Sequence, residues 1–307
     1  MISGLAIEVQ GLHKTYGTTV AVDDVSFGVV QGEILGILGA NGAGKTTSVE
    51  CMQGLREPDG GEVRVLGLDP HRQARELRHR IGSQLQESAL PDRLRVWEAL
   101  DLFASVTPGG ADWRTLLDQW GLADKAKAPF ASLSGGQRQR LFVALALVDD
   151  PEVVFLDELT QGLDPAGRRV AWELIRAIRR RGATVVLVTH YMEEAERLCD
   201  RLVVMRAGRV VSQGTPQELI ARSRRGIRVR FSAGGDALAW LEGVQDVETV
   251  TRHDHNFEVE GSGAVLAHVA AALVSRGIAP VDLRAEQPSL EDVYLELTGA
   301  PEQEDPR

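Results

Sequence analysis

Apolar and polar residues alternate along residues 5–30, on both sides of the segment Tyr16-Gly17-Thr18. A period of two is typical of strands that bury one face, and the central glycine favours a turn. The pattern therefore predicts two antiparallel strands with Tyr16 at the tip between them. An aromatic residue there is either an exposed hairpin side chain or a flat surface on which a nucleobase can stack, and the pattern does not choose between the two.

Later apolar runs are nearly continuous, which is typical of strands covered on both faces of a parallel sheet. They occupy residues 34–38, 153–156, 183–189 and 201–205, and shorter strand patterns lie at 60–66, 81–85 and 209–213. Helical patterns separate them, at residues 47–55, 72–80, 94–106, 113–120, 135–148 and 170–181, with another helix from Pro216. The alternation predicts an α/β domain over residues 1–221, with a helical subdomain at about 87–150.

The tail has a pattern of its own. Strands are expected at residues 227–231, 247–251, 256–260 and 279–283, and helices at 236–241 and 264–276, with a further helix at the end. This βαββαβ order predicts a small, ferredoxin-like α+β domain over residues 222–298. A small β-barrel is the alternative, but the helical run at residues 264–275 is too long for it. Residues 299–307, rich in Pro and acids, are expected to be disordered.

Composition narrows the classes of function. The chain of 307 residues has a formal net charge of −10. It therefore lacks the surplus of positive charge that nucleic-acid binding requires. Cys51 and Cys199 form no CxxC pattern, which indicates a reducing compartment. No stretch reaches the roughly 18 apolar residues of a membrane span, and the first ten residues do not resemble a signal peptide. We therefore expect a soluble, cytoplasmic chain.

The segment Gly39–Thr46 reads GANGAGKT, which has the spacing of a phosphate-binding loop. Glycines let successive backbone N–H groups turn toward one phosphate, because a Cβ would block the approach. Lys45 adds a positive charge for the β- and γ-phosphates, and Thr46 offers a hydroxyl to Mg²⁺. An apolar strand before the loop and a helix after it agree with a phosphate site rather than a chance glycine-rich turn.

Two further motifs carry candidate chemistry. Leu133-Ser134-Gly135-Gly136-Gln137 begins an amphipathic helix, and it is either a second phosphate site or simply a helix capped by Ser134. The apolar run at residues 153–156 leads into Asp157 and Glu158. Adjacent buried carboxylates are costly unless paired, so a cation or water is expected beside them. We expect Asp157 to hold the metal and Glu158, pointing the other way along the strand, to orient or deprotonate a water.

His190 and Gln86 also stand at strand ends. A histidine in this place is commonly structural, but ligands of parallel sheets bind beyond the carboxyl ends of the strands, so His190 is a candidate for the same site as Glu158. Gln86 lies in a short loop, and by itself it is a plain loop residue.

Together these motifs resemble the nucleotide-binding subunit of ABC transporters, in the family's order and over residues 5–221. GANGAGKT resembles the Walker A loop, LSGGQ (133–137) the family signature, VVFLDE (153–158) the Walker B strand and GLD (162–164) the D-loop. The resemblance thus implies a phosphate-loop NTPase fold of ABC type, with a mixed sheet core, an antiparallel β subdomain and a helical subdomain. It also implies ATP and Mg²⁺ as ligands and ATP hydrolysis coupled to transmembrane transport as the activity.

The resemblance also assigns roles to single residues. It implies that Tyr16 stacks on adenine, that Gln86 touches both the metal site and the membrane partner, and that His190 is the switch histidine at the γ-phosphate. The catalytic group is then Glu158, His190 and Gln86, and the metal group is Thr46, Gln86 and Asp157. The nucleotide group is Tyr16, Gly39, Asn41, Gly42, Ala43, Gly44, Lys45, Thr46, Thr47, Ser134, Gly135, Gly136, Gln137 and Asp164.

In this family the signature of one subunit completes the ATP site of a second. The resemblance therefore implies a head-to-tail homodimer bound to separate membrane-spanning permease subunits, peripheral on the inner face of the cell membrane. Leu159 departs from the pattern, since most members carry Pro there, and it puts the rigidity of that turn in doubt. The tail, with Ser289-Leu290-Glu291-Asp292-Val293-Tyr294, resembles the drug-export group of the daunorubicin-resistance type.

Two alternatives to an exporter ATPase stay open. One is the ATPase subunit of an importer, which differs in the shape of its tail and in its permease. The other is a soluble ABC ATPase that acts on DNA or ribosomes. About 90 residues separate Lys45 from Ser134, which leaves no room for the long coiled coil of the DNA-repair relatives. The acidic charge disfavours this second alternative as well.

Overall fold

The structure is a computed structural model, and it describes residues 4–84, 89–106, 112–223, 226–233, 239–253, 256–280 and 282–298. The chain divides into two compact units, residues 1–216 and 217–307. The division lies within helix α8 (Pro216–Ala221), a few residues before the boundary expected from the sequence. Among the described residues, no helix is both long enough and apolar enough to cross a membrane.

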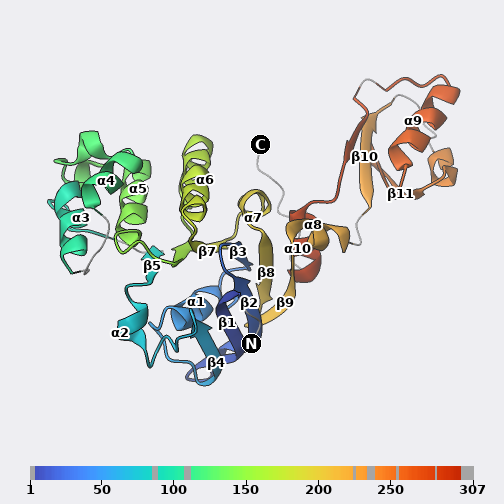
Figure 1. Cartoon of the computed structure of the whole chain (residues 1–307). Coiled ribbons are helices and arrows are strands. Elements are labelled where there is room, and N and C mark those ends of the chain that lie inside the picture. The colour runs from blue at the N-terminus through green and yellow to red at the C-terminus, as the bar shows by residue number, and fades with distance from the viewer. Residues whose placement is uncertain are drawn as a thin grey trace. The chain divides into compact units, whose positions relative to one another are not determined.

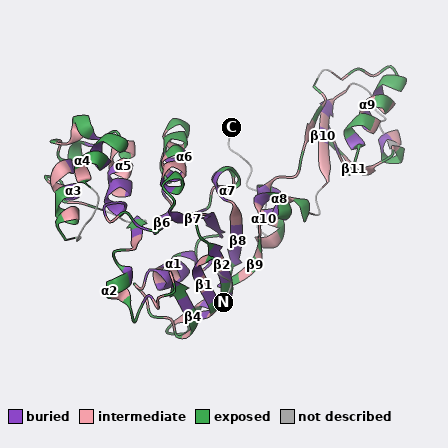
Figure 2. Cartoon of the chain, in the orientation of Figure 1, coloured by how far each residue is buried: buried purple, intermediate pink, exposed green. Residues whose placement is uncertain are grey.

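A six-stranded sheet forms the centre of the first unit (Figure 1). Its strands are β3 (Ile34–Leu38), β5 (Ile81–Gln84), β6 (Val153–Asp157), β7 (Thr184–Thr189), β8 (Arg201–Arg206) and β9 (Arg209–Gly214), in the order β5-β6-β7-β3-β8-β9. All neighbours are parallel except β8 and β9. Every residue of β3, β6 and β7 is buried, as the purple ribbon of Figure 2 shows, which explains their continuous apolar sequences.

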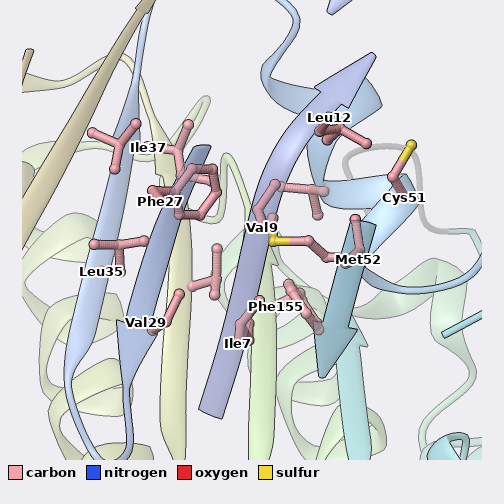
Figure 3. Packing of buried hydrophobic residues seen from close by; sticks show 14 of the residues in the cluster. Ile7, Val9, Leu12, Phe27, Val29, Leu35, Ile37, Cys51, Met52 and Phe155 are labelled. Atoms are coloured by element: carbon pink, nitrogen blue, oxygen red, sulfur yellow. The ribbon is translucent and has the colours of Figure 1, made fainter. Parts of the chain in front are cut away.

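A second, antiparallel sheet has the order β2-β1-β4 and consists of β1 (Leu5–Tyr16), β2 (Thr19–Val30) and β4 (Gly60–Val65). Tyr16 pairs with Thr19 across the predicted turn. The inward positions of this sheet, the central sheet and α1 (Lys45–Met52) form one core (Figure 3). Ile7, Val9, Met52 and Phe155 lie together in it. This core holds the loop between β3 and α1 against both sheets.

Helices fill the connections between the strands. They are α2 (Ala74–Leu77), α3 (Val96–Ser105), α4 (Trp113–Gln119), α5 (Gly135–Ala146), α6 (Pro165–Arg180) and α7 (Met192–Leu198), with 3-10 turns at Ala123–Lys125 and Phe130–Ser132. The chain between β5 and β6 forms the helical subdomain, where Val96 N donates to Ala128 O at 3.1 Å and Phe130 N donates to Leu94 O at 2.8 Å. The predicted α/β fold with an antiparallel and a helical subdomain is therefore confirmed.

The second unit is a four-stranded antiparallel sheet of β10 (Ile227–Ser232), β11 (Val247–His253), β12 (Asn256–Gly261) and β13 (Arg284–Glu286), in the order β11-β12-β10-β13. Helix α9 (Val265–Ser275) packs its buried face on this sheet, over the stacked pair Phe231 and Phe257. Helix α10 (Leu290–Thr298) is tied to β10, because Arg228 Nη2 donates to Asp292 Oδ1 at 3.0 Å.

The tail differs from its predicted pattern in two places. The first predicted helix appears as a 3-10 segment, Ala239–Gly243. The last strand lies at residues 284–286 instead of 279–283, because Pro280 has no N–H to give to a ladder. The tail is thus a small α+β unit with the expected antiparallel strands, and its ferredoxin-like classification stays a prediction.

Candidate active site

The carboxyl ends of β3, β6 and β7 meet at one edge of the central sheet, and the phosphate loop, Asp157 with Glu158, and His190 lie at the ends of these three strands. The loop after β3 is built from glycines that no other residue can replace without strain. Gly44 has φ 93°, and a Cβ there would lie 2.4 Å from the carbonyl oxygen of Ala21. A Cβ at Gly39 would lie 2.6 Å from the carbonyl oxygen of Met205. The loop therefore leaves its backbone N–H groups accessible to an anion.

Lys45 begins α1 and is only 5% exposed. Its Nζ donates to Gly39 O at 2.8 Å and to Ala40 O at 3.0 Å, so the ammonium group lies across the loop. Burial lowers the pKa of Lys45, while the charges of Glu158 and Asp157 raise it. In the described part of the chain this ammonium group hydrogen-bonds to carbonyl oxygens, so an incoming phosphate would supply a negatively charged partner that the carbonyls are not.

Asp157 is the last residue of β6 and is 5% exposed. Thr46 Oγ1 donates to its Oδ2 at 3.5 Å, and its Oδ1 is buried without a hydrogen-bond partner among the described residues. Burial, followed by the charge of Glu158, raises the pKa of Asp157 to about 6. An unpaired carboxylate oxygen beside a hydroxyl fits a divalent cation. The described residues contain no cluster of three or more His, Cys, Asp or Glu side chains for a metal.

Glu158 lies just beyond the end of β6 in the left-handed region, with φ 49°. The expected alternation along the strand does not apply to it, because the strand ends at Asp157 and the turn itself aims the Glu158 side chain. Its Oε1 lies 3.2 Å from Nδ1 of His190, which follows β7. His190 in turn lies against Tyr191, with ring centroids 4.2 Å apart. The parallel pairing of β6 and β7 thus brings Glu158 and His190 together, as the sequence predicted.

The signature residues form a capped helix start on an open surface. Ser134 is the N-cap of α5, where its Oγ accepts from Gln137 N at 3.3 Å and its N–H donates to Gln137 Oε1 at 3.0 Å. A Cβ at Gly135 or Gly136 would meet nothing within 4 Å. Among the described residues, no hydrogen bond or ion pair joins this segment to the loop after β3. In the described part of the chain, the signature is therefore not hydrogen-bonded to the phosphate loop of its own subunit.

The remaining predicted residues surround this centre. Asp164 is the N-cap of α6 and accepts from Gly167 N at 2.6 Å. Ala43 is buried, Thr47 is half-buried, and Asn41 and Gly42 are exposed on the loop. Gln86, predicted to touch the metal, lies outside the described residues.

Tyr16 is 41% exposed at the end of β1. The guanidinium of Arg56 lies 5.2 Å from the centre of its ring, and Nζ of Lys14 lies 5.9 Å from it. Sequence reasoning missed Arg56, because no motif connects the end of α1 with the first hairpin.

Comparison with known proteins agrees with this geometry. Residues 22–161 match the family model described as ABC transporter. The chain is 39% identical to the daunorubicin resistance ATP-binding protein DrrA3 of Streptomyces coeruleorubidus over 96% of each chain. It is also 39% identical to the Nod factor export ATP-binding protein I of Mesorhizobium japonicum, over 97% of this chain and 88% of that one.

Solved structures place the fold in the same family. The structure of cbiO1 from Clostridium perfringens, part of the ABC transporter complex cbiONQ, aligns with a TM-score of 0.66 at 28% identity, covering 72% of this chain and 92% of that one. A bacterial ABC transporter cassette solved as a dimer aligns with a TM-score of 0.61 at 27% identity, covering 68% of this chain and 98% of that one. The chain therefore belongs to the ABC transporter family, as one of its ATP-binding subunits, the ATPases that drive transport.

Proposed function

We propose that this chain hydrolyses ATP to power a membrane exporter, as a head-to-tail homodimer bound to membrane-spanning permease subunits. The observation that carries the proposal is the cluster at the ends of β6 and β7, where Asp157 lies 3.5 Å from Thr46 and Glu158 lies 3.2 Å from His190. A metal-binding carboxylate, a second carboxylate and a histidine beside a phosphate loop are the groups that nucleotide hydrolysis requires.

ATP binding follows from the residues around the loop. The backbone N–H groups of residues 39–47 surround the phosphates, and Lys45 exchanges its two carbonyl partners for phosphate oxygens. Tyr16 offers its exposed ring to the adenine, and Arg56 supports that ring by its cation–π contact. Thr46 and Asp157, together with Gln86, would hold Mg²⁺, and the bound cation would supply positive charge against the phosphates.

Glu158 has the geometry of a general base. Its carboxylate is 7% exposed and lies outside the strand, so it can accept a proton from a water that attacks the γ-phosphate. His190 lies within hydrogen-bond reach of that carboxylate and orients it, which places the imidazole beside the position of the γ-phosphate in this proposal. Leu159, where most relatives carry Pro, is fully buried, so packing rather than a proline ring holds this turn.

The open surface at Ser134 supports a shared ATP site. Gly135 and Gly136 have free space around them, and α5 begins at this point, so the positive end of the helix favours an anion here. We assign Ser134, Gly135, Gly136 and Gln137 to the ATP of the partner subunit, and Asp164 to the same interface. Residues 1–221 form the ATP-binding domain in this proposal, and residues 222–298 form an accessory domain.

Export rather than import is favoured by the relatives named for daunorubicin resistance and Nod factor export, which match nearly the whole chain, including the tail. The chain would then lie on the inner face of the cell membrane through its permease.

Purification from detergent-solubilised native membranes tests the proposal. The integral membrane protein that comes with the chain is reconstituted with it in vesicles whose ATP sites face outward. ATP-driven accumulation of daunorubicin or of a lipo-oligosaccharide inside the vesicles, absent in a Lys45→Ala complex, is the expected result. Release of a preloaded solute on addition of ATP would instead establish import, and a chain that brings no integral protein would contradict the proposal.

A further inference from the structure

Glu194, in α7, is a fully buried acid with 0% exposure. Among the described residues it makes no salt bridge with Lys or Arg. Burial raises the pKa of Glu194, whereas Thr189, Thr160 and Trp172 lower it through their polar side chains. Burying an acid without a charged partner costs stability. A fold alone does not require this, because an apolar side chain would fill the same space at lower cost.

The partner of Glu194 lies on another helix. Trp172 of α6 is 6% exposed, and its Nε1 donates to Glu194 Oε1 at 3.0 Å inside the core. Helix α6 begins at Asp164, the predicted D-loop residue. The indole is also covered by Arg197, whose guanidinium lies 5.4 Å from the ring centre. The acid therefore joins α7, which follows His190, to the helix that follows Asp164.

Two threonines near Glu194 belong to the segments that carry Glu158 and His190. Thr160 is two residues after Glu158 and 0% exposed, and Thr189 is directly before His190 and 1% exposed. Both hydroxyls lie close enough to the acid to affect its pKa, and so does the charge of His190. Oε2 of Glu194 and Oγ1 of Thr160 are nevertheless buried without a hydrogen-bond partner of ordinary geometry in the described part of the chain. Glu194 therefore lies beside both the turn that carries Glu158 and the segment that carries His190.

The backbone conformation of Glu158 requires stabilising contacts from neighbouring residues. Its φ of 49° is a left-handed conformation that is unfavourable for a residue with a side chain, and it persists only where surrounding contacts impose it. Its N–H donates to Val188 O at 2.9 Å, which ties it to β7. On the other side of the turn, Thr160 is fully buried and its hydroxyl lies close to Glu194.

We propose that Glu194 is a positioning residue for ATP hydrolysis. With Trp172 it holds the turn that carries Glu158 and the segment that carries His190 in one arrangement relative to α6. This inference rests on the proposed ATPase function, and it adds a buried acid that touches neither substrate nor metal. Its loss should lower kcat and leave KM and ATP affinity unchanged, because only the orientation of the base and the histidine depends on it.

Trp172→Phe tests this with a small change, since it removes the indole N–H and keeps a large ring. We expect kcat of the full-length chain to fall about tenfold, as for other residues that orient catalytic groups, with KM for ATP unchanged. Trp120→Phe is the matched control. Trp120 is 3% exposed, and its Nε1 has no hydrogen-bond partner in the described part of the chain, so its loss should leave kcat at the wild-type value.

Variants of Glu194 separate positioning from packing. Glu194→Gln keeps an oxygen for Trp172 and should retain kcat within about twofold, whereas Glu194→Met, of similar size, should lose about as much as Trp172→Phe. In the Met background, Trp172→Phe should have no further effect, because the two residues act as one pair.

Wild-type kcat in both Trp172→Phe and Glu194→Met would overturn the proposal, even if melting temperatures fell. An equal loss of kcat in Trp120→Phe would overturn it too. An error in the proposed function itself would give a different result. The wild-type chain with its membrane partner would then hydrolyse no ATP.

Discussion

At the scale of single residues, the buried carboxylate of Asp157 lowers the stability of the folded chain at neutral pH. Its pKa in the folded chain is about 6, against an ordinary value of 3.8, because burial and the charge of Glu158 disfavour the carboxylate. Below about pH 3 both the folded and the unfolded chain are protonated here, and the group contributes nothing. As the pH rises through this window the unfolded chain ionises first, so stability is lost, and the full cost is present above about pH 6.

Asp157→Asn removes this cost. In nucleotide-free and Mg²⁺-free buffer, we expect the variant to be more stable than wild type by about 3 kcal/mol at about pH 7.5, and nearly equal to it at about pH 3. Urea unfolding at the two pH values measures the difference. A stability gain that is the same at both pH values would mean that the acid is not held in its neutral form by burial.

Glu158→Gln should leave binding of ATP intact and nearly abolish turnover. The amide keeps the shape of the side chain but cannot accept the proton of the attacking water, and loss of a general base typically costs 10² to 10⁴ in rate. Steady-state hydrolysis and nucleotide titration of the same preparation measure the two effects. Glu173→Gln, on the exposed face of α6, is the control and should behave as wild type. A Glu158→Gln variant with more than about a tenth of wild-type activity would exclude Glu158 as the base.

The residue types of the site could be predicted, but their surroundings could not. The spacing from Gly39 to Thr46 and the acids after an apolar strand were readable because each follows from local backbone needs. The left-handed turn at Glu158 was not, since it depends on packing around residues 159 and 160. Glu194 and Arg56 were missed for a related reason, because their partners, Trp172 and Tyr16, are distant in the sequence.

At the scale of elements, the N-terminus of α5 has two predicted roles that a single substitution can separate. Ser134 caps the helix, and in the shared-site proposal it also contacts the γ-phosphate of the partner's ATP. Ser134→Asp preserves the cap, because Asp caps helices as well as Ser does, but it places a negative charge against the phosphate. We expect unchanged thermal stability and loss of ATP-dependent dimerisation.

Ser134→Ala is the complementary control. It removes the cap and should cost about 1 kcal/mol of stability. Thermal unfolding and sedimentation of both variants measure the two roles. If Ser134→Asp dimerised with ATP as readily as wild type, Ser134 would be a cap and nothing more.

The pattern of elements explains which of them the sequence could predict. Strands buried on both faces, such as β6 and β7, were predicted within one or two residues because burial leaves only apolar positions. Helix α6 begins at Pro165, five residues before its predicted start. Asp164 caps the helix and Pro165 lies in its first turn. Hydrophobic periodicity does not detect such a start, because these residues are not part of the apolar face. Helix α2 is shorter than predicted, with only Leu77 buried, because its charged sequence has little apolar face to hold it.

At the scale of the whole molecule, the shared-site proposal predicts a change of mass. ATP would join Lys45 of one subunit to Ser134 of the other, so the Glu158→Gln chain, which cannot hydrolyse ATP, should dimerise with ATP and remain monomeric without it. Sedimentation with and without Mg²⁺ATP measures this, and Lys45→Ala in the same background is the control that should stay monomeric. The same mass in both conditions would contradict a site shared between subunits.

The last prediction concerns coupling to the permease. Closure and reopening of the ATP-bound dimer do work only if the motion reaches a membrane partner, and the segment 87–96, directly after Gln86, is the surface we propose for it. The structure describes residues 89–96 of this segment. There, Leu90 and Leu94 have half-buried apolar side chains next to exposed polar residues. The backbone at Leu94 is fixed by two hydrogen bonds. Leu94 N donates to Pro91 O at 2.9 Å, and Leu94 O accepts from Phe130 N at 2.8 Å.

Leu90→Asp combined with Leu94→Asp should leave ATP binding near normal and uncouple the chain from its permease, because a charge without a partner is costly at an apolar interface. The matched control is Leu102→Asp, in which a 55% exposed side chain of α3 is changed in the same way outside the segment. Substrate-stimulated ATPase and export are measured in vesicles that contain the co-purified partner. We expect both to be lost in the double variant and kept in the control, because only the double variant charges the docking segment. Undiminished export in the double variant would place the docking surface elsewhere on the ATP-binding domain.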